Sequence, residues 1–308
     1  MRPKALREGA RRENQQPFMS EEKAPRRESA FLRRLAHWGA LDAPKALVRF
    51  SPKPIGAAFG IALPSLRRRI VRNLRSVHGV RGSWREQLDA VGTLANYAAC
   101  FAEAIASGRK DAKPRVNVHG EARLVTALAR GGVVLVTAHI GPWDLTAQLL
   151  GSKLSADVIV VMEREANAKA GELQDRHRGE RGLRVLHVGQ HPTDAVPLIA
   201  HLKRGGVAAL QLDRVPPSGR VLQVSLFGET FGAPEGPFRL ASLSGAQVVP
   251  VFARRIGFFD YELEISEPIS FARRPTAAEL QAGAQQAVDA MQAFIAQSPT
   301  QWFHFGRK

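Results

Sequence analysis

The sequence has little cysteine: Cys100 is the only one in 308 residues. A single cysteine excludes an intramolecular disulfide and a zinc site built from cysteine pairs. Cys100 lies in the apolar stretch 98–104, and no basic or helix-capping residue stands beside it. We therefore expect a buried, inert thiol and not a catalytic nucleophile.

Several catalytic and nucleotide-binding motifs are also missing. The sequence has no G-x-S-x-G, which argues against a serine acyl-enzyme. It has no G-x-G-x-x-G or G-x-x-x-x-G-K-[ST] loop, which argues against binding of a dinucleotide or a nucleoside triphosphate. His187, His191 and His201 occur without an H-E-x-x-H pair, a cysteine pair or a carboxylate cluster, so we predict no metal and no cofactor.

Long hydrophobic runs are missing too. A membrane-spanning helix needs about 18–20 uninterrupted apolar residues, and the nearest stretch, 54–66, is shorter and is broken by Pro64. Residues 1–28 mix both signs of charge, contain almost no large apolar residues and carry no apolar core of a secretory signal. We expect a disordered basic arm over residues 1–30 and a protein that lies on a membrane, not through it.

Acidic residues are the minority among the charges. Against 28 Asp and Glu stand 44 Lys and Arg, which gives a formal net charge of +16 at pH 7. This balance points to an anionic partner, and a phospholipid surface, an acidic carrier protein and nucleic acid all fit it. The 44% hydrophobic content is enough for one large core. We predict a single domain over 31–308, mainly helical at 31–110 and α/β at 111–308.

Strand and helix signals alternate from residue 132 onward. Runs rich in β-branched residues predict strands at 133–137, 157–161, 184–188, 207–212, 221–227, 247–252 and 261–265. Helical periodicity predicts helices at 143–150, 168–181, 193–203 and 237–243, and a capping box, Thr276 to Glu279, starts a final helix. We therefore predict an α/β fold with a mostly parallel central sheet flanked by helices.

A histidine and a carboxylate follow the strand predicted at 133–137. His139 lies just beyond the strand, and Asp144 lies five positions later in the first turn of the next helix. Ligands bind at the carboxyl ends of strands in open α/β sheets, and a histidine with a carboxylate is typical of a general base and its orienter. The ordinary alternatives are a structural histidine and an acid that only stabilises its helix.

A second carboxylate, Asp213, ends another strand of the same parallel set. It is therefore expected at the same edge of the sheet as His139, where it could orient the histidine or a substrate. Its alternative role is an ion pair with Arg214.

The sequence around His139 resembles the H-x4-D/E motif of the lysophospholipid acyltransferase superfamily, and in particular its lipid A biosynthesis branch, the lauroyl/myristoyl acyltransferases. The motif reads His139-Ile140-Gly141-Pro142-Trp143-Asp144, where the branch often has H-F-G-N-W-E. The resemblance continues through Leu202-Lys203-Arg204-Gly205-Gly206, Asp213-Arg214, Leu226-Phe227-Gly228, Gly236, Arg239-Leu240-Ala241, Gly245-Ala246 and Val249-Pro250-Val251. It covers roughly residue 32 to the end, although many members of the branch begin with a membrane-spanning segment.

The resemblance implies transfer of a fatty acyl chain from acyl carrier protein (acyl-ACP) or coenzyme A (acyl-CoA) to a hydroxyl of a membrane glycolipid or lysophospholipid. A lipid A-type precursor is the first expectation for the acceptor. His139 would be the general base, Asp144 would orient it, and Asp213 would be a third catalytic residue. The residues expected to bind substrate are Gly141, Trp143, Arg164 and Arg239, the two arginines through phosphates. No nucleic acid partner is expected.

Two amphipathic segments suggest how the protein would lie on the cytoplasmic face of the inner membrane, as a peripheral or monotopic protein. One has apolar residues at helical spacing among arginines: Leu66, Ile70, Leu74 and Val77 with Arg67, Arg68, Arg69, Arg72 and Arg75. The other is an apolar stripe that includes Phe31, Leu32, Leu35, Trp38 and Leu41. The alternative for both is packing onto the domain.

Two other functions remain open at this point. A thioesterase or hydrolase would share the histidine base but admit water in place of a lipid hydroxyl. A basic protein that binds a membrane or nucleic acid without catalysis would explain the charge, although no nucleic-acid motif is found.

Overall fold

The structure, a computed structural model, describes residues 38–154, 156–163, 176, 178–179, 183–188, 192–215 and 219–306. The arm predicted at 1–30 and the apolar residues 31–35 lie outside this range, as do Arg164, His191 and most of the helix predicted at 168–181.

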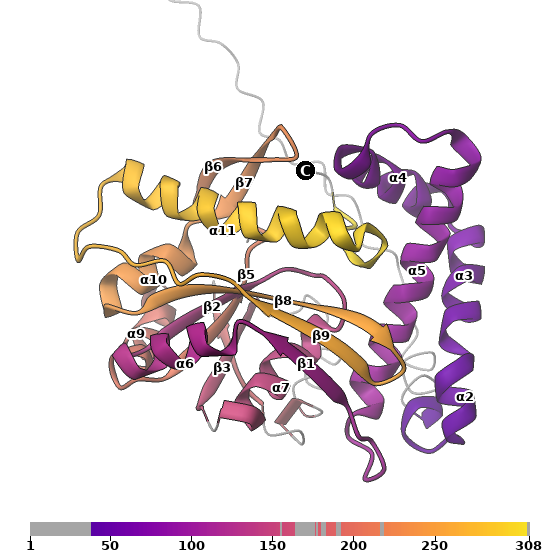
Figure 1. The fold of residues 1–308 in the computed structure, drawn as a ribbon, viewed down its shortest axis with the longest axis horizontal. Coiled ribbons are helices and arrows are strands. Elements are labelled where there is room, and N and C mark those ends of the chain that lie inside the picture. The colour runs from indigo at the N-terminus through magenta and orange to yellow at the C-terminus, as the bar shows by residue number, and fades with distance from the viewer. Residues whose placement is uncertain are drawn as a thin grey trace, which may run out of the picture.

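A seven-stranded sheet forms the centre of the described chain, in the order β1-β9-β8-β2-β5-β3-β4 (Figure 1). Its strands are β1 (Arg115–His119), β2 (Val133–Thr137), β3 (Val158–Glu163), β4 (Arg184–Val188), β5 (Val207–Gln211), β8 (Gln247–Gly257) and β9 (Asp260–Ile265). Every neighbouring pair is parallel except β8 with β9. The mostly parallel sheet flanked by helices that the sequence predicts is therefore confirmed.

The centre of the sheet is covered on both faces. In β2 the first four residues are all buried, which explains why this strand reads as a continuous apolar run and not as an alternating one. Val134 and Val136 face one hydrophobic cluster, whereas Val133 and Leu135 face the other.

One face is covered by α9 (Val196–Lys203), α10 (Gly236–Ser244) and α11 (Ala277–Gln297), together with a hairpin of β6 (Val221–Leu226) and β7 (Glu229–Pro234). The capping box that starts α11 is present, because the Thr276 hydroxyl accepts from the Glu279 backbone N–H and the Glu279 carboxylate accepts from the Thr276 N–H. The hairpin is a separate two-stranded sheet, so the strand predicted at 221–227 does not extend the central sheet.

The opposite face carries α6 (Glu121–Arg130) and α7 (Trp143–Leu154), with α11 lying across the sheet from them in Figure 1. Leu145 and Leu150 of α7 are buried against the sheet. Because α7 begins directly after the loop that carries His139, this packing fixes the position of the loop relative to the strands.

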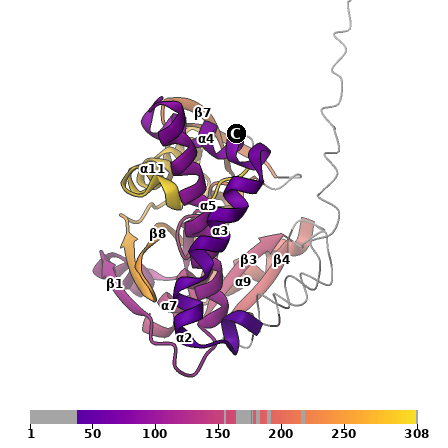
Figure 2. The ribbon, with the colours of Figure 1, turned by 90° about the vertical axis from the view of Figure 1, so that its right-hand side faces the viewer.

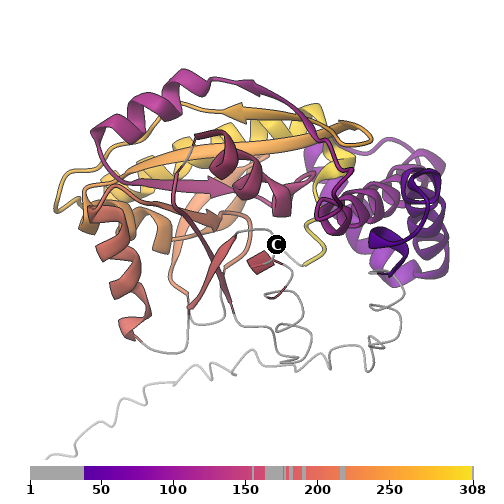
Figure 3. The ribbon, with the colours of Figure 1, turned by 90° about the horizontal axis from the view of Figure 1, so that it is seen from below.

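The N-terminal part consists of α2 (Lys45–Phe50), α3 (Pro52–Ala62), α4 (Pro64–His78) and α5 (Ser83–Ala106), grouped at one end of the sheet (Figure 3). Helices α3 and α5 run side by side (Figure 2). Two glycines permit this close approach: a Cβ at Gly56 would overlap Leu94 and Ala98 of α5, and Gly60 faces Val91.

The apolar stripe of α4 packs inward. Ile70 and Leu74 form a buried cluster with Ala90 and Leu94 of α5, and Leu66 packs against it. The prediction that this stripe contacts a membrane is therefore wrong, because α5 already covers it; the alternative of packing onto the domain is the observed one.

A buried carboxylate ties α5 to the sheet. Glu103 accepts hydrogen bonds from the Arg255 guanidinium at 2.8 Å and the Tyr261 hydroxyl at 2.7 Å. Cys100, one helical turn earlier, is buried as predicted, and burial together with the Glu103 charge raises the pKa of its thiol well above the usual range. Within the part of the chain that the structure describes, no helix combines the length and apolar character needed to cross a membrane.

Candidate active site

The loop after β2 holds His139 in a fixed backbone frame. The Phe303 N–H donates to the His139 carbonyl at 2.7 Å, and Ile140 forms an antiparallel bridge with Trp302. Gly141 has a positive φ of 53°, and a Cβ placed at this position would overlap the Ala253 carbonyl oxygen. The backbone conformation and the lack of space for a side chain therefore both require glycine there.

His139 and Asp213 form a direct side-chain pair. The two atoms joined are His139 Nδ1 and Asp213 Oδ1, 2.8 Å apart. The register of the sheet explains the pair: Thr137 of β2 lies opposite Gln211 of β5, and each of the two side chains follows its strand by two residues. The expectation that Asp213 lies at the same edge as His139 is met in this geometry.

Asp213 is 1% exposed, and its carboxylate accepts three hydrogen bonds from the described part of the chain. Its Oδ2 accepts from the His139 backbone N–H at 3.1 Å and from the Trp302 indole N–H at 3.2 Å, in addition to the bond at Oδ1. Burial alone would raise the pKa of this carboxyl. The charge and hydrogen bond of His139, with the charges of His304 and Arg214, outweigh that effect and hold the pKa below its usual range. An ionised Asp213 fixes Nδ1 of His139 as the protonated ring nitrogen.

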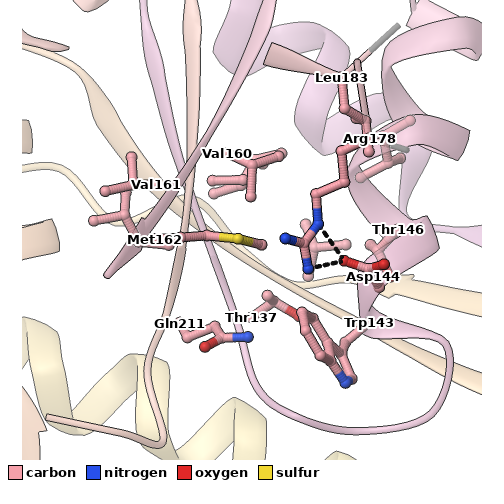
Figure 4. Close-up of a pocket in the computed structure, with 15 residues that line it drawn as sticks. Thr137, Trp143, Asp144, Thr146, Val160, Val161, Met162, Arg178, Leu183 and Gln211 are labelled. Atoms are coloured by element: carbon pink, nitrogen blue, oxygen red, sulfur yellow. Dashed lines mark hydrogen bonds and ion pairs between the residues drawn. The ribbon is translucent and has the colours of Figure 1, made fainter. Parts of the chain in front are cut away.

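Asp144 has a different partner. Its Oδ1 accepts from Arg178 Nη2 at 3.0 Å and Nε at 3.1 Å, and Figure 4 shows the guanidinium pointing at the carboxylate. The ring hydrogen bond that the sequence assigned to Asp144 is thus made by Asp213. A role for Asp144 in the reaction stays a prediction.

An apolar pocket lies between the sheet and α7, the helix that follows the His139 loop (Figure 4). Its empty volume is about 560 Å³ when the space at its opening to solvent is included. The lining residues are Leu135, Thr137, Trp143, Asp144, Thr146, Leu150, Val160, Val161, Met162, Arg178, Leu183, Ala209, Leu210, Gln211 and Val251. Trp143 belongs to both parts of the site, because its ring also packs edge-on against the His139 ring with centroids 5.0 Å apart.

The remaining predicted residues are placed as follows. The Gly141 N–H donates to the Gln301 carbonyl at 2.9 Å, so it is engaged within the protein. Arg239 of α10 pairs at 2.6 Å with Glu235, the residue just before that helix, and is not among the residues that line the pocket. Arg164 falls outside the described residues. Substrate binding by these three residues stays a prediction.

Two residues at the site were missed from the sequence. Arg178 falls within a segment predicted only as a helix, and Trp302 lies 163 positions from His139, too far for any spacing rule to connect them. Their roles follow only from the contacts with Asp144 and Asp213. The structure, over its described residues, groups no three His, Cys, Asp or Glu side chains in a way that could hold a metal.

Comparison with curated proteins gives no match. Among solved structures, the chain is similar to the 1-acyl-sn-glycerophosphate (LPA) acyltransferase PlsC from Thermotoga maritima, with 12% identity, a TM-score of 0.38, and coverage of 79% of this chain and 97% of PlsC. The family described as bacterial lipid A biosynthesis acyltransferase matches residues 16–308. That match spans nearly the whole chain and includes both His139 and Asp213; the protein therefore belongs to this family and is an acyltransferase.

Proposed function

We propose that the protein transfers a fatty acyl chain from acyl-ACP or acyl-CoA to a hydroxyl of a membrane glycolipid or lysophospholipid, with a lipid A-type precursor as the first candidate acceptor. The observation that carries the proposal is the buried His139–Asp213 hydrogen bond beside an apolar pocket. A base held in one tautomer and a site for a hydrocarbon chain are what this reaction needs.

His139 acts as the general base. Because Nδ1–H donates to Asp213, the other ring nitrogen, Nε2, takes the proton of the acceptor hydroxyl as its oxygen attacks the thioester carbonyl. The resulting tetrahedral intermediate collapses with cleavage of the carbon–sulfur bond. The protonated imidazole then returns the proton to the leaving thiolate, so no covalent acyl-enzyme is required.

The developing oxyanion needs hydrogen-bond donors. The N-terminus of α7 lies in the loop after His139, where its first N–H groups and the positive end of its dipole favour a negative charge. We assign the Trp143 N–H as one donor. The Gly141 N–H is already bonded to Gln301 and is not assigned this role.

The pocket takes the acyl chain. Burial of each methylene contributes about 0.8 kcal/mol, so a long chain gains much from a lining made of valine, leucine and methionine side chains. Thr137 and Gln211 end their strands nearest the His139 loop, whereas Leu135 and Ala209 lie two residues deeper. The thioester carbonyl would lie near Thr137 and Gln211, and the acyl chain would extend from there toward Leu135 and Ala209. The Asp144–Arg178 pair closes part of the wall.

Arg164 and Arg239 are proposed to bind acceptor phosphates through their planar guanidinium groups. For Arg239, this requires exchange of the Glu235 carboxylate for a phosphate.

The protein is proposed to dock on the cytoplasmic face of the inner membrane through α2 and α3. Large apolar side chains are exposed there: Phe50 by 64%, Ile55 by 52%, Phe59 by 53% and Ile61 by 69%. Exposed cations lie on the same helices, including Lys45, Arg49 and Lys53. An apolar surface bordered by cations suits an anionic leaflet, where each cation contributes about 1 kcal/mol.

Mass spectrometry of membrane lipids tests the function. Cells that express the wild type should contain a lipid class heavier by one acyl chain, and cells with His139→Ala should lack it. His119→Ala is the matched control, because His119 is exposed and pairs with Glu262 on the surface. Free fatty acid in place of acylated lipid would indicate a thioesterase. An acylated product that persists with His139→Ala would overturn the assignment of the base.

A further inference from the structure

The segment from Gln301 to His304 lies against the loop that carries His139. Backbone bonds join Gly141 to Gln301 at 2.9 Å and Phe303 to His139 at 2.7 Å. The Gln301 side chain in turn exchanges two hydrogen bonds with the backbone of Arg255, at 2.8 and 2.9 Å. The segment therefore lies between β8, to which the Gln301 side chain is bonded, and the His139 loop, to which its backbone is bonded.

Trp302 brings a polar atom from this segment into the buried pair. Its indole N–H donates to Asp213 Oδ2, the carboxylate oxygen that His139 does not use through its ring. The indole is 3% exposed and stacks on His304, with ring centroids 5.2 Å apart and planes at 23°. Because the ring is packed and its backbone is bridged to Ile140, the donor has little freedom to leave the carboxylate.

We propose that Trp302 is a positioning residue for the acyl transfer: its indole N–H fixes the plane of the Asp213 carboxylate, and thereby the orientation of the His139 base. The proposal rests on the proposed function for the reaction itself, but the positioning role concerns the geometry of His139 and can be measured without turnover.

The charge on Asp213 predicts the direction in which loss of the Trp302 N–H would shift the pH dependence of the reaction. Among the described residues, three cationic or ionisable groups face this carboxylate: His139 from the β2 loop, Arg214 from the next position in the chain, and His304, whose Nδ1 lies 4.0 Å from Oδ2. The indole dipole neutralises part of the negative charge on Oδ2. Without this donor, Asp213 would carry more negative charge, and we expect the acid limb of the pH–rate profile to move to higher pH.

The test compares two substitutions in adjacent buried aromatic residues. Trp302→Phe keeps an aromatic ring and removes the N–H. Phe303→Leu alters a similarly buried side chain, whose ring packs against Tyr97 and Phe305, and keeps the backbone N–H that binds the His139 carbonyl. For Trp302→Phe we expect kcat to fall roughly tenfold with KM changed less than twofold, and the acid limb of the pH–rate profile to move up by roughly 0.5 pH unit. Phe303→Leu should lower Tm but leave that limb in place.

An NMR measurement separates this proposal from the proposed function. The proton between His139 Nδ1 and Asp213 should give a downfield resonance, assigned by its loss in His139→Gln. In Trp302→Phe this resonance should shift or broaden, and in Phe303→Leu it should stay unchanged. An unchanged resonance and pH limb in a folded Trp302→Phe would overturn the positioning role, even if acyl transfer is confirmed. If the resonance shifts in Trp302→Phe but the wild type transfers no acyl chain, the proposed function would be overturned and the positioning role would stand.

Discussion

His139 Nδ1 lies 2.8 Å from Asp213 Oδ1, and this contact crosses 74 positions of the sequence. The two side chains meet because β2 and β5 are neighbouring parallel strands, so residues two positions beyond Thr137 and Gln211 are brought together. The motif partner Asp144, only five positions away, turns instead to Arg178. Sheet topology, and not spacing along the chain, therefore decides which carboxylate contacts the His139 ring.

The two carboxylates should differ in their effect on turnover. Asp213→Asn should lower kcat by roughly 10²–10⁴-fold, because an amide can present a donor to Nδ1 and select the wrong tautomer. Asp144→Asn keeps His139 and Asp213 intact and should cost less, on the order of tenfold or below. Rates with a defined acyl thioester, corrected for folded fraction by circular dichroism, would decide. Equal losses, or a larger loss for Asp144→Asn, would contradict the assignment of Asp213.

Stability should depend on pH through Asp213. Its folded-state pKa is lower than that of an ordinary aspartate, so the ionised carboxylate adds stability above about pH 4 that is lost as the pH falls through the folded-state pKa. Asp213→Asn should therefore be less stable than the wild type at pH 7 by about 2 kcal/mol, and the gap should narrow toward pH 3. Urea titrations at several pH values measure this. Asp42→Asn, at an exposed carboxylate, is the control for the removal of one negative charge.

Chain-length preference should respond to the floor of the pocket. Ala209 lies opposite Leu135 in the sheet and lines the cavity. Ala209→Leu adds three carbon atoms to this floor and should shift the preferred acyl chain shorter by roughly two to four carbons, with kcat on the short donor preserved. Competition between donors of different length would show the shift. A uniform loss on all donors would mean that the cavity is not the acyl site.

Membrane binding should weaken when the exposed face of α3 is made polar. Phe59 is 53% exposed, so Phe59→Ser should leave Tm nearly unchanged while vesicle affinity falls about fivefold. Val196→Ser is the matched control, because Val196 is 58% exposed on α9, at the other end of the sheet from α3 (Figure 1). Sedimentation with anionic vesicles compares the two. An equal loss for both variants would argue against a docking face on α3.

The sequence predicted the strands at the centre of the sheet well because they are covered on both faces. Runs such as that of β2 have few other ways to be buried, and the position of His139 after this strand follows directly. Strand β1 was not predicted: its residues alternate between exposed and partly exposed, and the strand is defined only by its pairing with β9.

The site was predictable only in part, because some of its contacts depend on pairing between distant segments. The strand-end positions of His139 and Asp213 are local properties, and parallel pairing places both at one edge. Which carboxylate reaches the imidazole depends on the neighbour of β2 in the sheet, and the Trp302 contact depends on a segment 163 positions away. Tertiary packing determines which of these distant residues come into contact, and hydrophobic periodicity carries no information about that packing.

Because Cys100 is buried, its reactivity can be used to measure local unfolding of the native protein. As the only cysteine, buried within α5 and with the pKa of its thiol raised, it should react with a maleimide or an aromatic disulfide only when local unfolding exposes α5. The alkylation rate of an unmodified sample therefore measures the frequency of that local unfolding. If α2 and α3 dock on lipid, the same rate should fall when vesicles are added, with no label introduced into the protein.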